Sequence, residues 1–232
     1  MHLPNPMIEG RLLRRYKRFL ADVELEDGSV ITAHCPNTGS LLGCKEEGSR
    51  VILRDSQNPK RKLLYVFQTI EVDGTLVNVD TGLPNAAVFE AIEAGEIPEL
   101  TGYDTHKREV KYGTNSRIDV YMEKASGEKC YVEVKSTTLV RERTAQFPDA
   151  VTTRGLKHLG ELSQVVRDGD RAVQFFFIGR SDATEFRPAE DIDPKYTAGL
   201  REAAEAGVEI LAYTAEVEPS SIRVARRIPI VL

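Results

Sequence analysis

Apolar and polar residues alternate along the first third of the chain in the manner of short, half-buried strands. The segment ADVELEDGSVITAHC alternates on both sides of Asp27-Gly28, a dipeptide typical of a tight hairpin turn. SRVILRD and KLLYVFQTIEV predict further strands, and EVDGTLVNV predicts a second hairpin around Asp73-Gly74. Five short strands in about 70 residues favour a small barrel of the five-stranded OB type, although another small barrel or sandwich would fit the same pattern.

From about residue 83 onward, helical and strand patterns alternate instead. A helix is predicted from Asn85, as its cap, to about Ala94, with Gly95 as its stop. Three strands follow, in KREVKYG, RIDVYME and CYVEVKS, and then a long helix over about 149–166. The remaining elements are a strand in RAVQFFFIG, a helix in PKYTAGLREAAEAG and a final strand in VEILAYTAEV. RAVQFFFIG does not alternate, as expected for a central strand covered on both faces. We therefore predict an α/β (α+β) chain with an OB-like barrel over residues 1–82 and a mixed α/β domain over residues 83–232.

The strand CYVEVKS carries unusual charges for a β-rich segment. Side chains alternate across a strand, so Glu133 and Lys135 share one face. Asp119 lies on the preceding strand, and in a hairpin it would face Glu133 with their Cβ atoms roughly 5 Å apart. Two carboxylates this close repel each other unless a cation lies between them. An alternative is a pair of structural cross-strand ion pairs, Asp119 with Lys135 and Glu133 with Arg117.

If a cation is bound, its chemistry follows from the ligands. Carboxylate oxygens alone suit a hard divalent ion, so the expected cofactor is Mg²⁺ or Mn²⁺. Such an ion activates water and polarises a phosphoryl oxygen. Lys135 would then orient the water or stabilise the developing negative charge.

Positive charge is clustered although the net charge is −5. The strongest cluster is RLLRRYKR, with five positive and no negative residues, and KRK and RVARR each add three. Such clusters are often ordinary solvated surface, but on an acidic protein they also fit a polyanionic partner. On the predicted long helix, a further basic stripe could clamp backbone phosphates or be a solvated face. The candidate DNA contacts are Arg14, Arg15, Tyr16, Lys17, Arg18, Lys60, Arg61, Lys62, Arg154, Lys157 and His158.

Tyr16 and Phe19 stand among the basic residues of the first cluster. Aromatic side chains of OB folds stack on bases, and Tyr16 is a candidate for that role. For Phe19 we favour a place in the barrel core.

The sequence predicts a cytoplasmic protein without membrane association. No apolar run approaches the ~20 residues that span a bilayer, and the N-terminus lacks the apolar core of a signal peptide. Three cysteines, an odd number without a CxxC motif, are expected to be buried thiols in a reducing compartment.

The order of these motifs resembles a known superfamily and, more closely, one family. Asp119 followed by Glu133-Val-Lys135 on adjacent strands, between two helices, resembles the PD-(D/E)XK nuclease-like superfamily, with Ile118 where the superfamily name has proline. The blocks that resemble the sugar fermentation stimulation protein A family are RYKRFLADV, HCPNTG, NPKRK, EVKYG, SRID, CYVEVKS, FPDAVTTRG, KHLGEL and GVEILAY. They run from about residue 14 to 213 and so cover nearly the whole chain.

The resemblance implies an N-terminal OB-like domain, a C-terminal PD-(D/E)XK nuclease-like domain and DNA binding with little sequence preference. It implies metal-binding carboxylates at Asp119 and Glu133, a catalytic Lys135, and a further acid from the leading helix. For that acid the helical wheel favours Glu93, whereas the match of the EAI block favours Glu90, which we choose. The expected function is a metal-dependent deoxyribonuclease. Alternatives are a non-catalytic DNA-binding regulator of sugar (maltose) metabolism and an RNA-processing factor.

Overall fold

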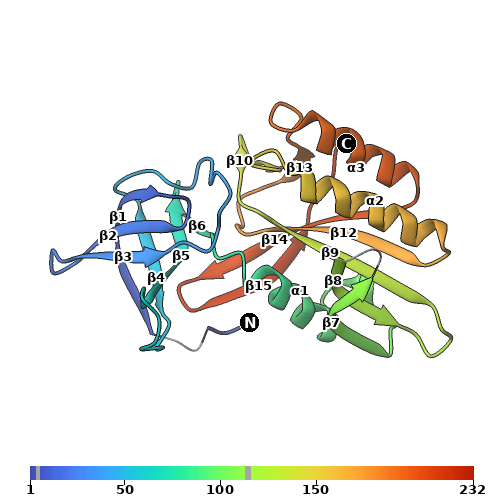
Figure 1. Ribbon diagram of the computed structural model, residues 1–232, viewed down its shortest axis with the longest axis horizontal. Helices are drawn as coiled ribbons and strands as arrows, with labels where there is room; N and C mark the ends of the chain where they lie inside the picture. The colour runs from blue at the N-terminus through green and yellow to red at the C-terminus, as the bar shows by residue number, and fades with distance from the viewer. Residues whose placement is uncertain (4–5, 113–115) are drawn as a thin grey trace.

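The computed structural model describes residues 1–3, 6–112 and 116–232, and it shows two domains side by side (Figure 1). The first domain is a sheet in the order β3-β2-β1-β4-β5-β6, in which β3 also pairs with β5. This pairing closes the first five strands into the predicted barrel, and β6 extends β5 as a hairpin. Its strands are β1 (Met7–Tyr16), β2 (Leu20–Leu25), β3 (Val30–His34), β4 (Arg50–Asp55), β5 (Tyr65–Val72) and β6 (Thr75–Asn78).

The two predicted hairpins of the barrel are confirmed. Gly28 and Gly74 have φ values of +79° and +75°, in the left-handed region that favours glycine. The prediction that Phe19 is a core residue is wrong, because its side chain is 46% exposed. It follows Lys17 and Arg18 in the turn between β1 and β2, while Leu12 and Phe67 fill the barrel instead.

The second domain is built on a mixed sheet in the order β15-β14-β12-β9-β8-β7. The non-alternating strand β12 is central, as predicted, and runs parallel to both β9 and β14. Helix α1 (Pro84–Glu93) packs on one face, and α2 (Thr153–Arg167) and α3 (Pro194–Glu205) pack on the other (Figure 1). The strands are β7 (Thr105–Tyr112), β8 (Ser116–Glu123), β9 (Lys129–Thr137), β12 (Arg171–Ile178), β14 (Glu209–Glu218) and β15 (Ser221–Arg227).

Several short elements were not predicted. A small sheet is formed by β10 (Val140–Arg141), β11 (Thr144–Phe147) and β13 (Glu185–Pro188), and a 3₁₀ helix covers Pro98–Leu100. These elements are too brief to show a period in the sequence. β15 was not recognised in the sequence because of its basic residues, although its apolar residues Ile222 and Val224 alternate with polar ones and are buried.

The long helix begins later than predicted because Asp149 serves the contact between the domains. The Asp149 carboxylate accepts a hydrogen bond from the backbone N–H of Leu41, 2.9 Å away, and its carbonyl accepts one from the Ser40 hydroxyl. Thr152 caps α2 instead, because its hydroxyl accepts from the N–H of Gly155. Residues 36–41 of the barrel are thereby fastened beside the N-terminus of α2.

All three cysteines are buried and free, as predicted. Within the described part of the chain, no helix combines the length and apolarity needed to cross a membrane.

Candidate functional site

Three carboxylates lie in one row across the sheet of the second domain. Glu109 and Asp119 lie opposite each other between two paired positions of β7 and β8, and continuing the register of β8 against β9 by one residue from Val120 and Val132 brings Asp119 level with Glu133. The expected closeness of Asp119 and Glu133 follows from this register. Gln174 continues the row on β12, and its amide donates to the Glu133 carbonyl oxygen.

Asp119 is held by two donors. The side-chain amide of Asn85 donates to Oδ1 at 2.6 Å, and the backbone N–H of Val134 donates to Oδ2 at 2.7 Å. Burial, and next the nearby charge of Glu133, raise the pKa of Asp119 to about 7. Asn85 was predicted as the cap of α1, but the helix begins at Pro84, and its N-cap residue is Leu83, which makes no side-chain capping bond. The structure therefore assigns Asn85 to orienting Asp119.

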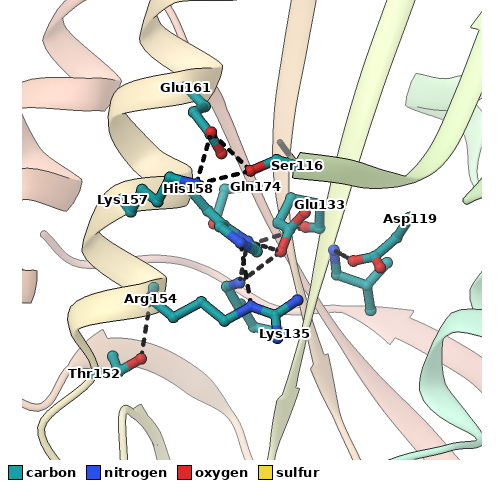
Figure 2. A network of polar contacts seen from close by, with 12 residues as sticks. Ser116, Asp119, Glu133, Lys135, Thr152, Arg154, Lys157, His158, Glu161 and Gln174 are labelled. Atoms are coloured by element: carbon teal, nitrogen blue, oxygen red, sulfur yellow. Dashed lines mark hydrogen bonds and ion pairs between the residues drawn. The ribbon is translucent and has the colours of Figure 1, made fainter. Parts of the chain in front are cut away.

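Glu133 is almost completely buried, with 3% of its surface exposed. Its Oε1 accepts a hydrogen bond from the Lys135 ammonium at 2.7 Å and lies in very close contact with Nδ1 of His158 (Figure 2). Burial alone would raise the pKa of Glu133, but the contacts with His158 and Lys135 outweigh it and hold that pKa below its ordinary value. The second oxygen, Oε2, is buried and has no hydrogen-bond partner. A buried carboxylate oxygen without a donor is well suited to a cation.

Three polar contacts hold the His158 ring. The Arg154 Nε donates to Nε2 of His158 at 3.4 Å, while Nδ1 contacts Oε1 of Glu133 and lies 3.2 Å from the Lys135 ammonium. His158 is only 5% exposed. The ring lies between α2 and β9, supports Glu133 and lines the cavity described below, and its contact with DNA stays a prediction.

A second network lies beside the first (Figure 2). Ser116 donates to Glu161 at 2.7 Å and accepts from Lys157 at 3.1 Å. Lys157 also pairs with Glu161, yet its side chain remains 54% exposed. Lys157 is thus available to a ligand, whereas Oε1 of Glu161 positions Ser116 and Lys157 and its Oε2 is buried without a hydrogen-bond partner.

These groups surround a cavity of about 580 Å³. Its lining consists of Asn85, Glu109, Ser116, Arg117, Asp119, Glu133, Arg154, Lys157 and His158. Carboxylates and cations therefore meet in one open space, an arrangement that suits a metal ion together with a phosphate group. Neither ion pair of the alternative interpretation is found among the described residues, since Lys135 pairs with Glu133 and not with Asp119.

The oxygen ligands available in the cavity are of the type that a hard divalent cation prefers, but the side chains do not yet lie close enough together to coordinate one. Asp119 and Glu133 offer oxygen ligands, and one oxygen of Glu133 is unpartnered. Among the described residues, however, no three His, Cys, Asp or Glu side chains are already grouped closely enough to hold an ion. Side chains would have to move for a full site to form.

Glu90, predicted as the third acid, does not line the cavity. Its side chain is 58% exposed, and its carboxylate lies 3.4 Å from the N-terminal ammonium of Met1. This ammonium also donates a hydrogen bond to the carbonyl oxygen of Ile222 on β15. Glu93 is also exposed and outside the cavity. The correction follows from the orientation of α1, which turns Asn85 rather than either glutamate toward Asp119.

The predicted basic residues of β1 are partly used by the fold. Arg14 pairs with Asp22, and Arg15 and Arg18 donate to backbone carbonyls of residues 37–39. Tyr16 donates to Asp22, and the Arg14 guanidinium lies over its ring. The side chain of Lys17 has no bond or ion pair among the described contacts.

The two basic clusters of the barrel are not brought together. Lys17 follows the end of β1, whereas Lys60, Arg61 and Lys62 lie in the loop that adjoins its beginning. The intervening strand has ten residues, a span of roughly 30 Å. Only the cluster with Lys17 lies beside the segment that contacts Asp149. The arginines of RVARR are engaged as well, by Glu216, the Ala183 carbonyl and Glu99.

Asn85, Glu109 and Ser116 line the cavity but were not predicted as site residues from the sequence. Asn85 was taken for a helix cap, and no local pattern separates the two roles. Glu109 lies in the predicted strand KREVKYG, and pairing this strand with RIDVYME as a hairpin would have set it across from Asp119.

Comparison with known proteins matches both domains to family models. Residues 82–221 match the "Sugar fermentation stimulation protein RE domain", and residues 13–79 match the "SfsA N-terminal OB domain". A sugar fermentation stimulation protein homolog of Geobacter sulfurreducens is 54% identical over 230 residues, covering 99% of this chain and 98% of that protein. A homolog of Pelobacter propionicus is 54% identical over the full length of both chains.

A solved structure, that of Pyrococcus furiosus SfsA in complex with Ca²⁺, is similar over the full length of both chains. The TM-score is 0.89 and the sequence identity 31%. The similarity covers the barrel, the mixed sheet and the junction between them.

Proposed function

Since the chain belongs to the sugar fermentation stimulation protein family, we propose that it binds DNA with little sequence preference and cleaves phosphodiester bonds with the help of a divalent cation. Asp119 and Glu133 would hold the ion, with Mg²⁺ or Mn²⁺ as the expected cofactor. We place this activity in the cytoplasm, as the sequence suggests.

The observation that carries the proposal is the unpartnered Oε2 of Glu133. A buried carboxylate oxygen left without a donor costs free energy in the folded protein, on the order of 1–3 kcal/mol. Asp119 adds to this cost, since burial raises its pKa to about 7. A cation beside both carboxylates would remove both penalties. The Ca²⁺ in the structure of the Pyrococcus relative supports this, because Ca²⁺ prefers oxygen ligands as Mg²⁺ and Mn²⁺ do.

When bound, the cation supplies a Lewis acid that polarises the phosphoryl group and activates water. Lys135 carries a positive charge 2.7 Å from Glu133 and can stabilise negative charge on the phosphate as it develops. His158 contacts the same oxygen of Glu133, with its Nδ1 3.2 Å from the Lys135 ammonium, and Asn85 fixes Asp119. These contacts keep the two carboxylates in place while substrate enters.

Arg154 and Lys157 are suited to backbone phosphates, because both are exposed and both line the cavity. The turn of Lys17 and Phe19 extends this basic surface onto the barrel, beside residues 36–41, which contact Asp149. The exposed Phe19 ring is free to stack on an unpaired base. We therefore propose that DNA runs from this turn to the N-terminal part of α2.

The experiment uses labelled single- and double-stranded DNA with Mg²⁺, Mn²⁺ or EDTA. Cleavage should require the metal and should be lost in Asp119→Ala and Lys135→Ala, while both variants still bind DNA. Glu93→Ala, an exposed acid outside the cavity, is the matched control and should cleave at the wild-type rate. Equal cleavage by all four proteins would indicate a contaminating nuclease.

The same assay separates the alternatives. DNA binding without cleavage by the wild type would favour a regulator of sugar (maltose) metabolism that uses the domain as a scaffold. Cleavage of RNA but not DNA would favour RNA processing.

A further inference from the structure

We propose that Glu109 is the third carboxylate ligand of the divalent cation, supplied by strand β7 in place of an acid from α1. This inference rests on the proposed function, since it concerns the same ion. It assigns Glu109 a role that neither the sequence motif nor the leading helix suggested.

The position of Glu109 is set by a kink that β7 and β8 share. Arg108 lies over the ring of Phe89 on the α1 side of the sheet, whereas Val110, two residues later, packs against the core on the α2 side. On β8, Val120 packs on the α1 side and Ile118 on the α2 side. In a regular strand these residues would share a face.

Both strands therefore change face at the opposing positions Glu109 and Asp119. Val110 and Ile118 then face α2, where Ser116 is bonded to Glu161, and both carboxylates line the cavity. Glu109 has a φ of +53°, a conformation that is costly for glutamate. It is the position at which the ladder between β7 and β8 lacks a backbone pair.

The fold gains nothing visible from a glutamate at this position. Glu109 is exposed, and its side chain makes no hydrogen bond or ion pair among the described contacts. Its charge instead adds to the repulsion on Asp119. Asparagine or glycine would adopt the same backbone conformation with less strain and without this repulsion.

An independent observation indicates what the charge serves. The unpartnered Oε2 belongs to Glu133, whose surface is 97% buried and which lines the same cavity. A divalent cation at that oxygen would lie in the row of Glu133, Asp119 and Glu109. Hard cations take six or more oxygen ligands, and affinity rises with the charge of the ligands. Glu109 is exposed and has a long side chain, so it can turn toward the ion as the site fills.

Calorimetric titration with Mn²⁺, without DNA, tests the inference. Glu109→Gln should weaken Mn²⁺ binding by about tenfold or more, because loss of even an outer-shell partner costs 10–100-fold. Glu93→Gln, which removes an equal charge outside the cavity, should bind as the wild type does. Asp119→Asn should weaken binding independently of Glu109.

The outcomes separate this inference from the proposed function. Unchanged affinity in Glu109→Gln, with weakened affinity in Asp119→Asn, would overturn the role of Glu109 and leave the metal site standing. A wild type that binds no Mn²⁺ would overturn both.

Thermal melts of Glu109→Asn provide a second test that does not depend on the amide of glutamine. In EDTA this variant should melt at or above the wild-type temperature, since asparagine tolerates a positive φ. Mn²⁺ should raise its melting temperature much less than that of the wild type. A lower melting temperature in EDTA would show that Glu109 supports the fold, and would overturn its assignment as a ligand.

Discussion

Asp119→Asn should remove a pH-dependent destabilisation of the metal-free protein. The folded-state pKa of Asp119 is raised from 3.8 to about 7, first by burial and then by the charge of Glu133. Between these values the folded protein holds a proton that the unfolded chain releases. The contribution of Asp119 to the free energy of unfolding therefore falls as pH rises from about 4 to about 7, and it is constant above that.

The magnitude follows from linkage. Each pKa unit corresponds to 1.36 kcal/mol, so the two units from pH 5 to pH 7 account for up to about 2.7 kcal/mol. Glu133 contributes little in this interval, because its pKa is held below the ordinary value of 4.5 in the folded protein, and the same small contribution is expected in the variant. In Asp119→Asn the pH-dependent component is absent.

The substitution also has a cost that does not change with pH. The asparagine oxygen can still accept from Val134, but its amide would meet the donor of Asn85 unless that side chain turns over. We expect this mismatched hydrogen bond to lower the free energy of unfolding by about 1 kcal/mol. The diagnostic quantity is therefore the change with pH of the difference between the two proteins.

Urea denaturation in EDTA at pH 5, 6, 7 and 8 measures this difference. The free energy of unfolding of the variant, relative to that of the wild type, should rise by up to about 2.7 kcal/mol from pH 5 to pH 7, and by little more at pH 8. Mn²⁺ at a hundredfold excess over its dissociation constant should then stabilise the wild type by roughly 2.7 kcal/mol and the variant much less.

Parallel curves for the two proteins would refute the reasoning, because Asp119 would then ionise as in the unfolded chain. A uniform loss of about 3 kcal/mol in the variant, with no effect of Mn²⁺ on the wild type, would instead indicate a structural ion pair.

Three further predictions concern the surroundings of the site. Gly39→Ala should destabilise the protein by about 1–3 kcal/mol in urea denaturation, because the added Cβ would lie 2.9 Å from Oδ1 of Asp149 at the domain contact; unchanged stability would mean that this contact adapts easily. His158→Ala should weaken Mn²⁺ binding about 10–100-fold in calorimetry with DNA affinity unchanged, since the ring supports Glu133 and is buried; a selective loss of DNA affinity would instead support the predicted DNA contact. Lys17→Ala should lower the slope of log K against log salt by about 0.9 for one phosphate, and replacing Lys60–Lys62 with alanine should lower it by up to about 2.7 if all three contact DNA; no change in either would place the DNA elsewhere.

Much of the fold was predictable because its signals are local. The turns at Asp27-Gly28 and Asp73-Gly74 fix two hairpins through backbone conformations that few other residues adopt. The apolar run in β12 has no polar face and so belongs in the middle of a sheet. Asp119 and Glu133 could be paired because register in a hairpin is set by neighbouring residues.

Residues whose roles depend on distant parts of the chain were not predictable in this way. Phe19 is a large apolar residue of the kind that usually fills a core, but it lies in the turn between β1 and β2 and its side chain is exposed outside the barrel. Arg15 reads as a free cation in the sequence, but in the folded protein it donates to the carbonyls of Asn37 and Gly39, more than 20 residues away.

The candidate site divides along the same line. That Asp119, Glu133 and Lys135 share one region is predictable from the amino-acid sequence, because strand periodicity and hairpin pairing act over a few residues. That α1 presents Asn85 rather than Glu90 to this region, and that a kink turns Glu109 toward it, becomes visible in the folded protein. The rotation of a helix and the bend of a ribbon are set by packing against the whole core, and the sequence of the segment alone does not contain that information.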